Sequence, residues 1–222
     1  AGQQLAERLD EFEAHARQTA DLNNRLYHEV IDSRMRPFAD GVHGFPRLVR
    51  DLGRQLGKQV QLEITGTATP VDRDILDKLD APLNHLLRNA VDHGLETPDE
   101  RRSAGKPETG TLRLEARHVA GSLSITISDD GRGIDRKRVR AKAIERGIIA
   151  ADAILSDEEV DNLIFAPGFS TAASVSNISG RGVGMDVVAT NIRRLKGRID
   201  IRSVPDPKIS PAGINCRRLI GI

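Results

Sequence analysis

The chain has 222 residues, and its 33 Lys and Arg nearly balance its 32 Asp and Glu, so its net charge favours neither nucleic acid nor an acidic membrane as a partner. Hydrophobic residues make up 38% and charged residues 29%, which is too apolar for a disordered tail and, without any long apolar run, too polar for a membrane protein. A single cysteine, Cys216, excludes an internal disulfide framework and a cysteine-based zinc site, and it favours a cytoplasmic location.

The first predicted element is a long helix over residues 3–36. This stretch contains no Gly or Pro, and apolar or small residues recur in it at heptad-like spacing. Such a helix would be roughly 50 Å long. A narrow apolar stripe on so long a helix needs a partner helix, in the same chain or in another. We therefore place a boundary near residue 40, between a helical arm and a compact domain.

The compact domain is predicted to mix helices and strands. Helical patterns occur over 45–56, over 70–93 with a break near Pro82, and over 135–146, 156–165 and 185–195. Strand-like alternation occurs over 60–64, 112–114, 123–127 and 198–202. Residues 166–182 read as a loop rich in Gly, Ser and Thr. Residues 205–222 read as an atypical tail without a clear strand, which would leave an exposed sheet edge.

Four polar residues stand out on the helix that ends near residue 94. Its spacing places His85, Asn89, Asp92 and His93 at i, i+4, i+7 and i+8, on one face. An Asn amide oxygen is a hard, neutral ligand suited to Mg²⁺ that is already bound to phosphates. A His one turn earlier can orient or deprotonate a nucleophile. The alternative is a polar helix face with ordinary hydrogen bonds.

Two glycine motifs follow. The strand that ends at Asp129 continues into Gly131 and Gly133, where a carboxylate can accept a hydrogen bond from an exocyclic amine and glycines allow close backbone approach. The segment 179–186 alternates Gly with other residues directly before a helix, a favourable anion cradle. It matches neither a Walker A loop nor a Rossmann fingerprint. A plain turn and a flexible hinge are the respective alternatives.

Together, in this order, the motifs resemble the ATPase superfamily of histidine kinases, gyrase-type topoisomerases, mismatch-repair ATPases and heat-shock chaperones. The chain is similar in particular to the CheA-type chemotaxis kinases. Residues 85–96 resemble their N box, with His85 in place of the usual acidic residue, 165–172 resemble their Phe box and lid, and 179–187 resemble their second glycine box. The resemblance extends from about residue 22 to residue 202.

The resemblance implies a role for each matching residue. Asn89 would ligate Mg²⁺, Asp129 would bind the adenine amine, and Arg138 would reach the γ-phosphate. His85 would assist phosphoryl transfer to the acceptor histidine, with catalysis by positioning and charge neutralisation. The other implied nucleotide-binding residues are Asp92, His93, Gly131, Gly133, Ser170, Thr171, Gly180, Arg181, Gly182, Val183, Gly184 and Met185.

The implied fold is α+β, a two-layer α/β sandwich of the histidine-kinase ATPase (Bergerat) type, with a mixed sheet, helices on one face and a preceding long helical dimerisation arm. The expected domains are a partial dimerisation segment over 1–40, an ATP-binding catalytic domain over 41–204 and the tail over 205–222. The implied protein is a cytoplasmic, homodimeric, ATP- and Mg²⁺-dependent histidine kinase. It would phosphorylate a separate His-containing phosphotransfer domain, with a response regulator downstream and a receptor and coupling protein acting on the full-length protein.

Two other functions stay open. A hydrolytic relative would use a Glu four residues before the Asn, and His85 at that position argues against one. A nucleotide-binding dimerisation scaffold with degenerate catalysis is opposed by the intact Asn89, Asp129 and glycine motifs. No phosphoacceptor domain is found in the chain, which is expected to be a fragment. His28 on the long helix is expected to be a solvated histidine rather than a phosphoacceptor.

Overall fold

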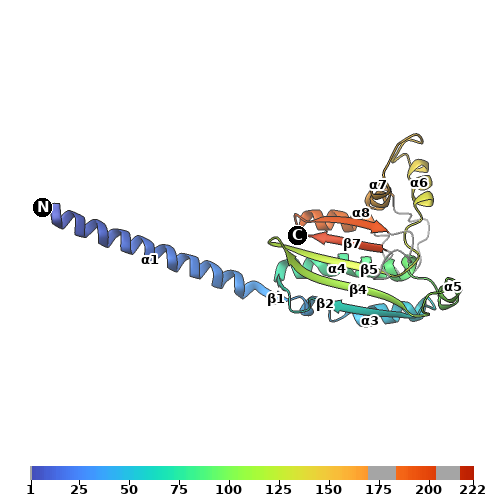
Figure 1. Ribbon diagram of the computed structural model, residues 1–222, viewed down its shortest axis with the longest axis horizontal. Coiled ribbons are helices and arrows are strands. Elements are labelled where there is room, and N and C mark those ends of the chain that lie inside the picture. Colours follow the sequence, from blue (N-terminus) through green and yellow to red (C-terminus); the bar gives the residue numbers. More distant parts are fainter. Residues whose placement is uncertain (1, 170–183, 204–215) are drawn as a thin grey trace. The chain divides into compact units, whose positions relative to one another are not determined.

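The computed structural model describes residues 2–169, 184–203 and 216–222. The chain divides into two compact units, residues 1–36 and residues 37–222 (Figure 1). The first unit is formed almost entirely by α1 (Gly2–Arg34), which confirms the predicted long helix. Several large apolar side chains of α1 are exposed, including Phe12 (73%), Leu22, Leu26 and Val30.

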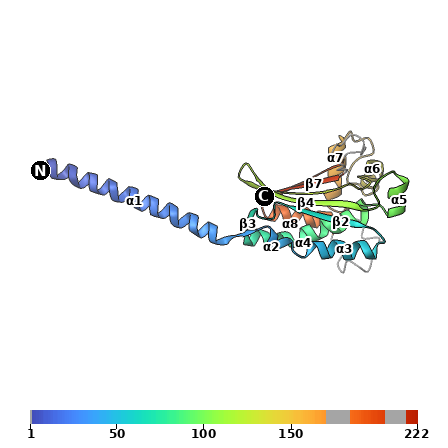
Figure 2. The same cartoon turned by 60° about the horizontal axis from the view of Figure 1, so that its bottom comes forward.

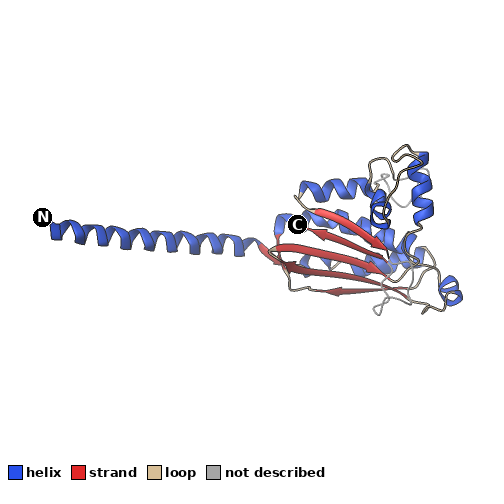
Figure 3. Cartoon of the chain, turned by 45° about the horizontal axis from the view of Figure 1, so that its top comes forward, coloured by secondary structure: helices blue, strands red, loops and turns tan. Residues whose placement is uncertain are grey.

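The second unit is built on a mixed five-stranded sheet with the strand order β2-β4-β5-β7-β6 (Figure 3). β2 pairs with β4 in parallel, and the other neighbouring strands are antiparallel. The strands of this sheet are β2 (Val60–Thr65), β4 (Gly110–Val119), β5 (Ser122–Asp129), β6 (Arg198–Ser203) and β7 (Cys216–Gly221). The four strands predicted from alternation are confirmed.

The helices α3 (Phe45–Gln55), α4 (Arg73–Asn89) and α8 (Met185–Arg194) lie on one side of this sheet (Figure 2). Side chains alternate along β4, where Leu112 and Leu114 are buried and Arg113 is exposed. The apolar residues of the sheet and of these helices form one hydrophobic core. This is the expected two-layer α+β sandwich with helices on one face.

β7 corrects the prediction for the end of the chain. Residues 216–221 form a strand that lies between β5 and β6, so the tail does not leave a sheet edge exposed at β5. Two consecutive arginines, Arg217 and Arg218, interrupt the alternation and hide the strand from pattern reading. Ile220 is nevertheless buried in the core, opposite Ile125 on β5 and Ile199 on β6.

The predicted break at Pro82 is also wrong. α4 continues through Pro82, which is buried, and the helix changes at Ala90 into a π-helical turn, Ala90–Gly94. A proline inside a helix costs one backbone hydrogen bond. Burial of Leu79, Leu83 and neighbouring leucines on the core side of α4 outweighs that cost here.

The remaining elements are short. α6 (Arg136–Glu145), α7 (Asp157–Asn162) and the 3-10 turn Leu163–Phe165 confirm two predicted helices. Pattern reading missed β1 (Met35–Pro37), α2 (Ala39–Val42), β3 (Pro70–Asp72) and α5 (Pro98–Ser103). Across the residues that the structure describes, no helix combines the length and the hydropathy needed to cross a bilayer.

Candidate nucleotide site

The candidate site begins at the C-terminal end of α4. Asn89 is the last residue of this helix, and its amide Nδ2 lies 2.7 Å from the Sδ of Met185, to which it donates a hydrogen bond. Met185 is the first residue of α8 and is buried, and Gly184 precedes it at the N-cap. The structure therefore brings together the Asn-bearing helix and the end of the second glycine motif, 96 residues apart in sequence.

His85 lies one helical turn before Asn89 and is half-buried. Burial lowers the pKa of His85 below its ordinary value of 6.5, and the nearby Arg88 charge lowers it further. The imidazole is therefore neutral at pH 7, with a nitrogen able to accept a proton.

Asp92 and His93 do not continue the α-helical face that their spacing predicted. Both lie in the π-helical turn, which advances the chain by fewer degrees per residue than an α-helix. Lys58, just after α3, holds this turn: its Nζ donates to the carbonyl oxygens of Val91 (2.8 Å) and Asp92 (2.6 Å). The Asp92 carboxylate lies 3.8 Å from His93 Nε2 at the surface of the turn.

Asp129 lies at the end of β5 with only 1% of its surface exposed. Its Oδ1 accepts a hydrogen bond from the Gly131 backbone N–H at 3.1 Å. A Cβ atom on Gly131 would lie 2.1 Å from the Gly94 carbonyl oxygen, so only glycine allows these two backbones to touch. A Cβ on Gly94 would in turn lie 3.4 Å from the Asp129 carboxylate. The first glycine motif thus packs directly on the end of the π turn.

Other predicted residues have different positions. Gly133 adopts a positive φ of 74°, which favours glycine. Arg138 is exposed on α6, a helix that contacts α7 and the 3-10 turn, and its backbone N–H is capped by Asp135. Six predicted residues lie outside the described part of the chain: Ser170, Thr171, Gly180, Arg181, Gly182 and Val183.

The side chains available as metal ligands fit a cation that is held mainly by phosphate oxygens, rather than one that is enclosed by protein ligands. Within the described ranges, no group of three or more His, Cys, Asp or Glu could hold a metal ion. With its nitrogen bonded to Met185, the Asn89 amide keeps its oxygen available as a hard ligand. Mg²⁺ in phosphate-transfer sites takes one or two protein ligands and fills its octahedron with phosphate oxygens and water.

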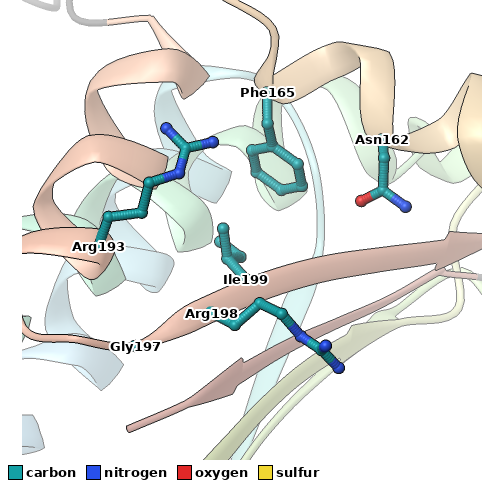
Figure 4. A pocket seen from close by; sticks show the side chains of 6 residues that line it. All are labelled: Asn162, Phe165, Arg193, Gly197, Arg198 and Ile199. Atoms are coloured by element: carbon teal, nitrogen blue, oxygen red, sulfur yellow. The ribbon is translucent and has the colours of Figure 1, made fainter.

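A hollow of about 220 Å³ lies elsewhere, between the 3-10 turn, the end of α8 and β6 (Figure 4). It is lined by Asn162, Phe165, Arg193, Gly197, Arg198 and Ile199. None of the predicted site residues lines it, and Arg198 is paired with Asp200 at 3.0 Å.

Sequence reasoning missed a charged cluster next to Asp129 in the chain, formed by buried Glu96 and Arg101 and partly buried Lys106 and Asp130. Arg101 is completely buried, and it forms ion pairs with the carboxylates of Glu96 and Asp130. The four residues look like ordinary surface charges in the sequence, where no spacing rule links Arg101 to Asp130 across 29 positions. A tertiary contact of this kind leaves no local signal.

Comparison with known proteins agrees with this geometry. Residues 75–213 match the model of the family described as histidine kinase-, DNA gyrase B-, and HSP90-like ATPase. The chain is 52% identical over 184 residues to a chemotaxis protein CheA of Rhizobium meliloti, covering 83% of this chain and 24% of that protein. It is 51% identical over 176 residues to the sensor histidine kinase CheAY of Helicobacter pylori, covering 78% and 22%.

Among solved structures, the histidine kinase AdeS of Acinetobacter baumannii aligns with a TM-score of 0.46 and 19% identity, over 85% of this chain and 65% of that one. The chain spans about a quarter of the length of the curated relatives it matches. The family match covers more than half of the chain and includes every described site residue. The chain belongs to the histidine kinase-, DNA gyrase B- and HSP90-like ATPase family, and within it resembles the ATPase domain of CheA-type kinases.

Proposed function

We propose that this chain binds Mg-ATP and transfers its γ-phosphoryl group to a histidine on a separate phosphotransfer domain, in a chemotaxis-like two-component system. The observation that carries the proposal is the buried Asp129 carboxylate, which sits at the junction of the first glycine motif with the end of the Asn-bearing helix. Relatives named as chemotaxis proteins and sensor histidine kinases support the reaction class.

Asp129 is proposed to recognise the base. An ionised carboxylate only accepts hydrogen bonds, and the 6-amino group of adenine donates them. Burial makes this contact selective, because a purine with a 6-oxo group would bring an acceptor against an acceptor in a site that excludes water. Gly131 holds Oδ1 of the carboxylate through its N–H.

Asn89 is proposed to supply the protein ligand for Mg²⁺ through its amide oxygen. The ion, when bound, would neutralise charge on the phosphates. Met185 orients the amide by accepting from its nitrogen, and Gly184 opens α8 beside it. Asp92, His93, Gly133 and Arg138 complete the proposed nucleotide contacts, together with the six predicted residues outside the described part of the chain.

His85 is proposed to act on the acceptor histidine. Because burial keeps the His85 imidazole neutral, it can accept a hydrogen bond or a proton from one ring nitrogen of the acceptor. The other nitrogen of the acceptor is then free to bond to the γ-phosphorus while the bond to the leaving ADP oxygen breaks. Proton transfer and positioning both contribute to phosphoryl transfer of this kind.

We further propose that the helical segment makes the protein a homodimer and that residues 37–222, with β7 included, form the catalytic domain. The exposed apolar residues on α1 support pairing with a second helix. A kinase that consumes ATP needs a compartment that supplies it, which supports a cytoplasmic location. The response regulator, receptor and coupling protein remain proposed partners of the full-length protein.

The test uses radiolabelled Mg-ATP and a purified histidine phosphotransfer domain from a CheA relative. Wild-type chain should label the domain, and Asn89→Ala should reduce labelling by at least about a hundredfold, as for loss of a main electrostatic group. Asn84→Ala is the matched control, because Asn84 lies on the same helix and its amide donates to the Asp80 carbonyl one turn earlier. Nucleotide binding without any labelling would overturn the kinase assignment and favour the dimerisation scaffold.

A further inference from the structure

Arg101 is a buried cation beside the first glycine motif, and every nitrogen of its guanidinium has a partner. Nη1 and Nη2 bond the two carboxylate oxygens of Asp130, at 3.1 and 2.9 Å. Nη1 also lies 3.2 Å from Glu96 Oε2, and Nε and Nη2 donate to the carbonyls of Pro107 and Thr109. The bidentate fork fixes both the position and the plane of the Asp130 carboxylate.

The Lys106 side chain bonds the backbone of the same turn. Its Nζ donates to the carbonyl oxygens of Asp130 (3.1 Å) and Gly131 (2.8 Å), and it pairs with Glu96 Oε1 at 2.7 Å. The Lys106 side chain is only 14% exposed. Arg101 and Lys106 therefore hold the Asp130 side chain and two successive backbone carbonyls from one side.

The helix that carries Arg101 is itself anchored. α5 begins with a capping box, in which the Thr97 hydroxyl accepts from the Glu100 N–H and the Glu100 carboxylate accepts from the Thr97 N–H. The same Glu100 carboxylate bonds Arg132 at 3.1 Å. These contacts set α5 as a fixed support for the turn that follows β5.

The anchored turn positions the proposed base-binding carboxylate. Gly131, held by Lys106 at its carbonyl, donates its N–H to Oδ1 of Asp129. A shift of the backbone at 130–131 therefore moves the donor that orients Asp129. A buried ion cluster adds little net stability, because desolvation offsets the attraction, so its value here lies in specifying one geometry.

We infer that Arg101 and Lys106 are positioning residues that hold Asp129 where it selects a 6-aminopurine over a 6-oxopurine. The inference rests on the proposed function. In this proposal the two residues act through Asp130 and Gly131 and not through a contact with the nucleotide.

The test is calorimetric binding of ADP and of IDP to the full 222-residue chain, compared as a ratio of affinities. Wild type should prefer ADP by at least about tenfold, the value of one hydrogen bond to a charged group. Lys106→Met, Arg101→Lys and Arg101→Met should each lower this ratio by about threefold or more. Thermal unfolding of each variant identifies the folded ones, and Lys106→Met decides the matter if the Arg101 variants do not fold.

Arg136→Met is the matched control. Arg136 makes a similar bidentate pair with buried Asp161, at 2.8 and 2.9 Å, where α6, α7 and β6 meet. Its loss should lower stability and leave the ADP-to-IDP ratio at the wild-type value. If Arg101 and Lys106 had a purely structural role, their variants would also lose stability and keep the wild-type ADP-to-IDP ratio. That result would overturn the inference.

Asp129→Asn separates this inference from the proposed function. The Asn amide can donate to a 6-oxo group, so this variant should lose the preference for ADP. If it keeps the wild-type ratio, the base assignment itself fails. If it loses the ratio while the Lys106 and Arg101 variants keep it, only the positioning role fails.

Discussion

Burial and the charge of Arg88 lower the pKa of His85, so this residue makes the stability of the protein depend on pH. Its neutral form is favoured in the folded protein, so the unfolded chain takes up a proton first as pH falls below 6.5. The contribution of His85 to stability is therefore complete above pH 6.5 and is lost as pH falls from 6.5 toward the lowered folded pKa.

The lowered pKa of His85 predicts the pH profile of phosphoryl transfer. The acid limb of the rate should have its midpoint below pH 6.5, because His85 stays neutral there, and His85→Gln should remove that limb. The stability of His85→Gln should also vary less with pH just below 6.5. His15→Gln, an exposed histidine on α1, should keep the wild-type profile. An acid limb unchanged in His85→Gln would contradict the assignment.

Gly131 gives a second prediction at the residue scale, because its missing side chain allows the contact with the Gly94 carbonyl. Gly131→Ala places a Cβ 2.1 Å from that oxygen, so the backbone must shift, at a cost of about 1–3 kcal/mol in unfolding free energy. Urea denaturation measures the loss, and nucleotide affinity should fall with it.

Gly44→Ala is the control for this prediction. Nothing lies within 4 Å of a Cβ at Gly44, whose φ of −81° suits any residue. Equal stability of the two variants would mean that the close approach at Gly131 has no energetic weight.

Residue type and spacing proposed Asn89, Asp129 and Gly131 as site residues, but the arrangement of these residues could not be predicted. They did not reveal that Asn89 bonds Met185, or that Gly131 touches Gly94, because both contacts join segments far apart in sequence. The role of Arg101 could not be predicted for the same reason, because its ion pairs with Glu96 and Asp130 depend on the tertiary fold and leave no local sequence pattern.

At the scale of elements, β7 shows how position in a sheet overrides local pattern. A strand with neighbours on both sides is stabilised by two sets of backbone hydrogen bonds, so two adjacent arginines do not prevent it from forming. Strands with clean alternation, such as β2 and β4, were found from sequence. The same reasoning explains the Pro82 error, since core packing on α4 outweighs one lost hydrogen bond.

Ile220 packs β7 into the hydrophobic core. It is 1% exposed, so Ile220→Ala should lower the unfolding free energy by about 2–5 kcal/mol through lost burial and a cavity. Ile154→Ala, at a position 98% exposed, should change stability by less than about 0.5 kcal/mol. Chemical denaturation of both variants measures the difference. Equal, small effects would show that β7 is not part of the cooperative core.

At the scale of the whole molecule, the helical segment accounts for the proposed dimer. Leu22 and Leu26 are large apolar residues about half exposed on α1, at the spacing of a coiled-coil seam. A double substitution of Leu22 and Leu26 by Lys should shift the chain from dimer to monomer in analytical ultracentrifugation. Glu29→Gln on the same helix should leave the dimer intact, and a wild-type chain that is monomeric at high concentration would contradict the dimer.

Calorimetric titration with a non-hydrolysable ATP analogue decides whether the chain has a nucleotide site in which Asp129 recognises the base. Wild type should bind the analogue, and bind it more tightly with Mg²⁺, while Asp129→Asn should lose at least about tenfold in affinity and keep the wild-type thermal unfolding transition. Equal affinity of the two folded proteins, or no binding by folded wild type, would contradict the account.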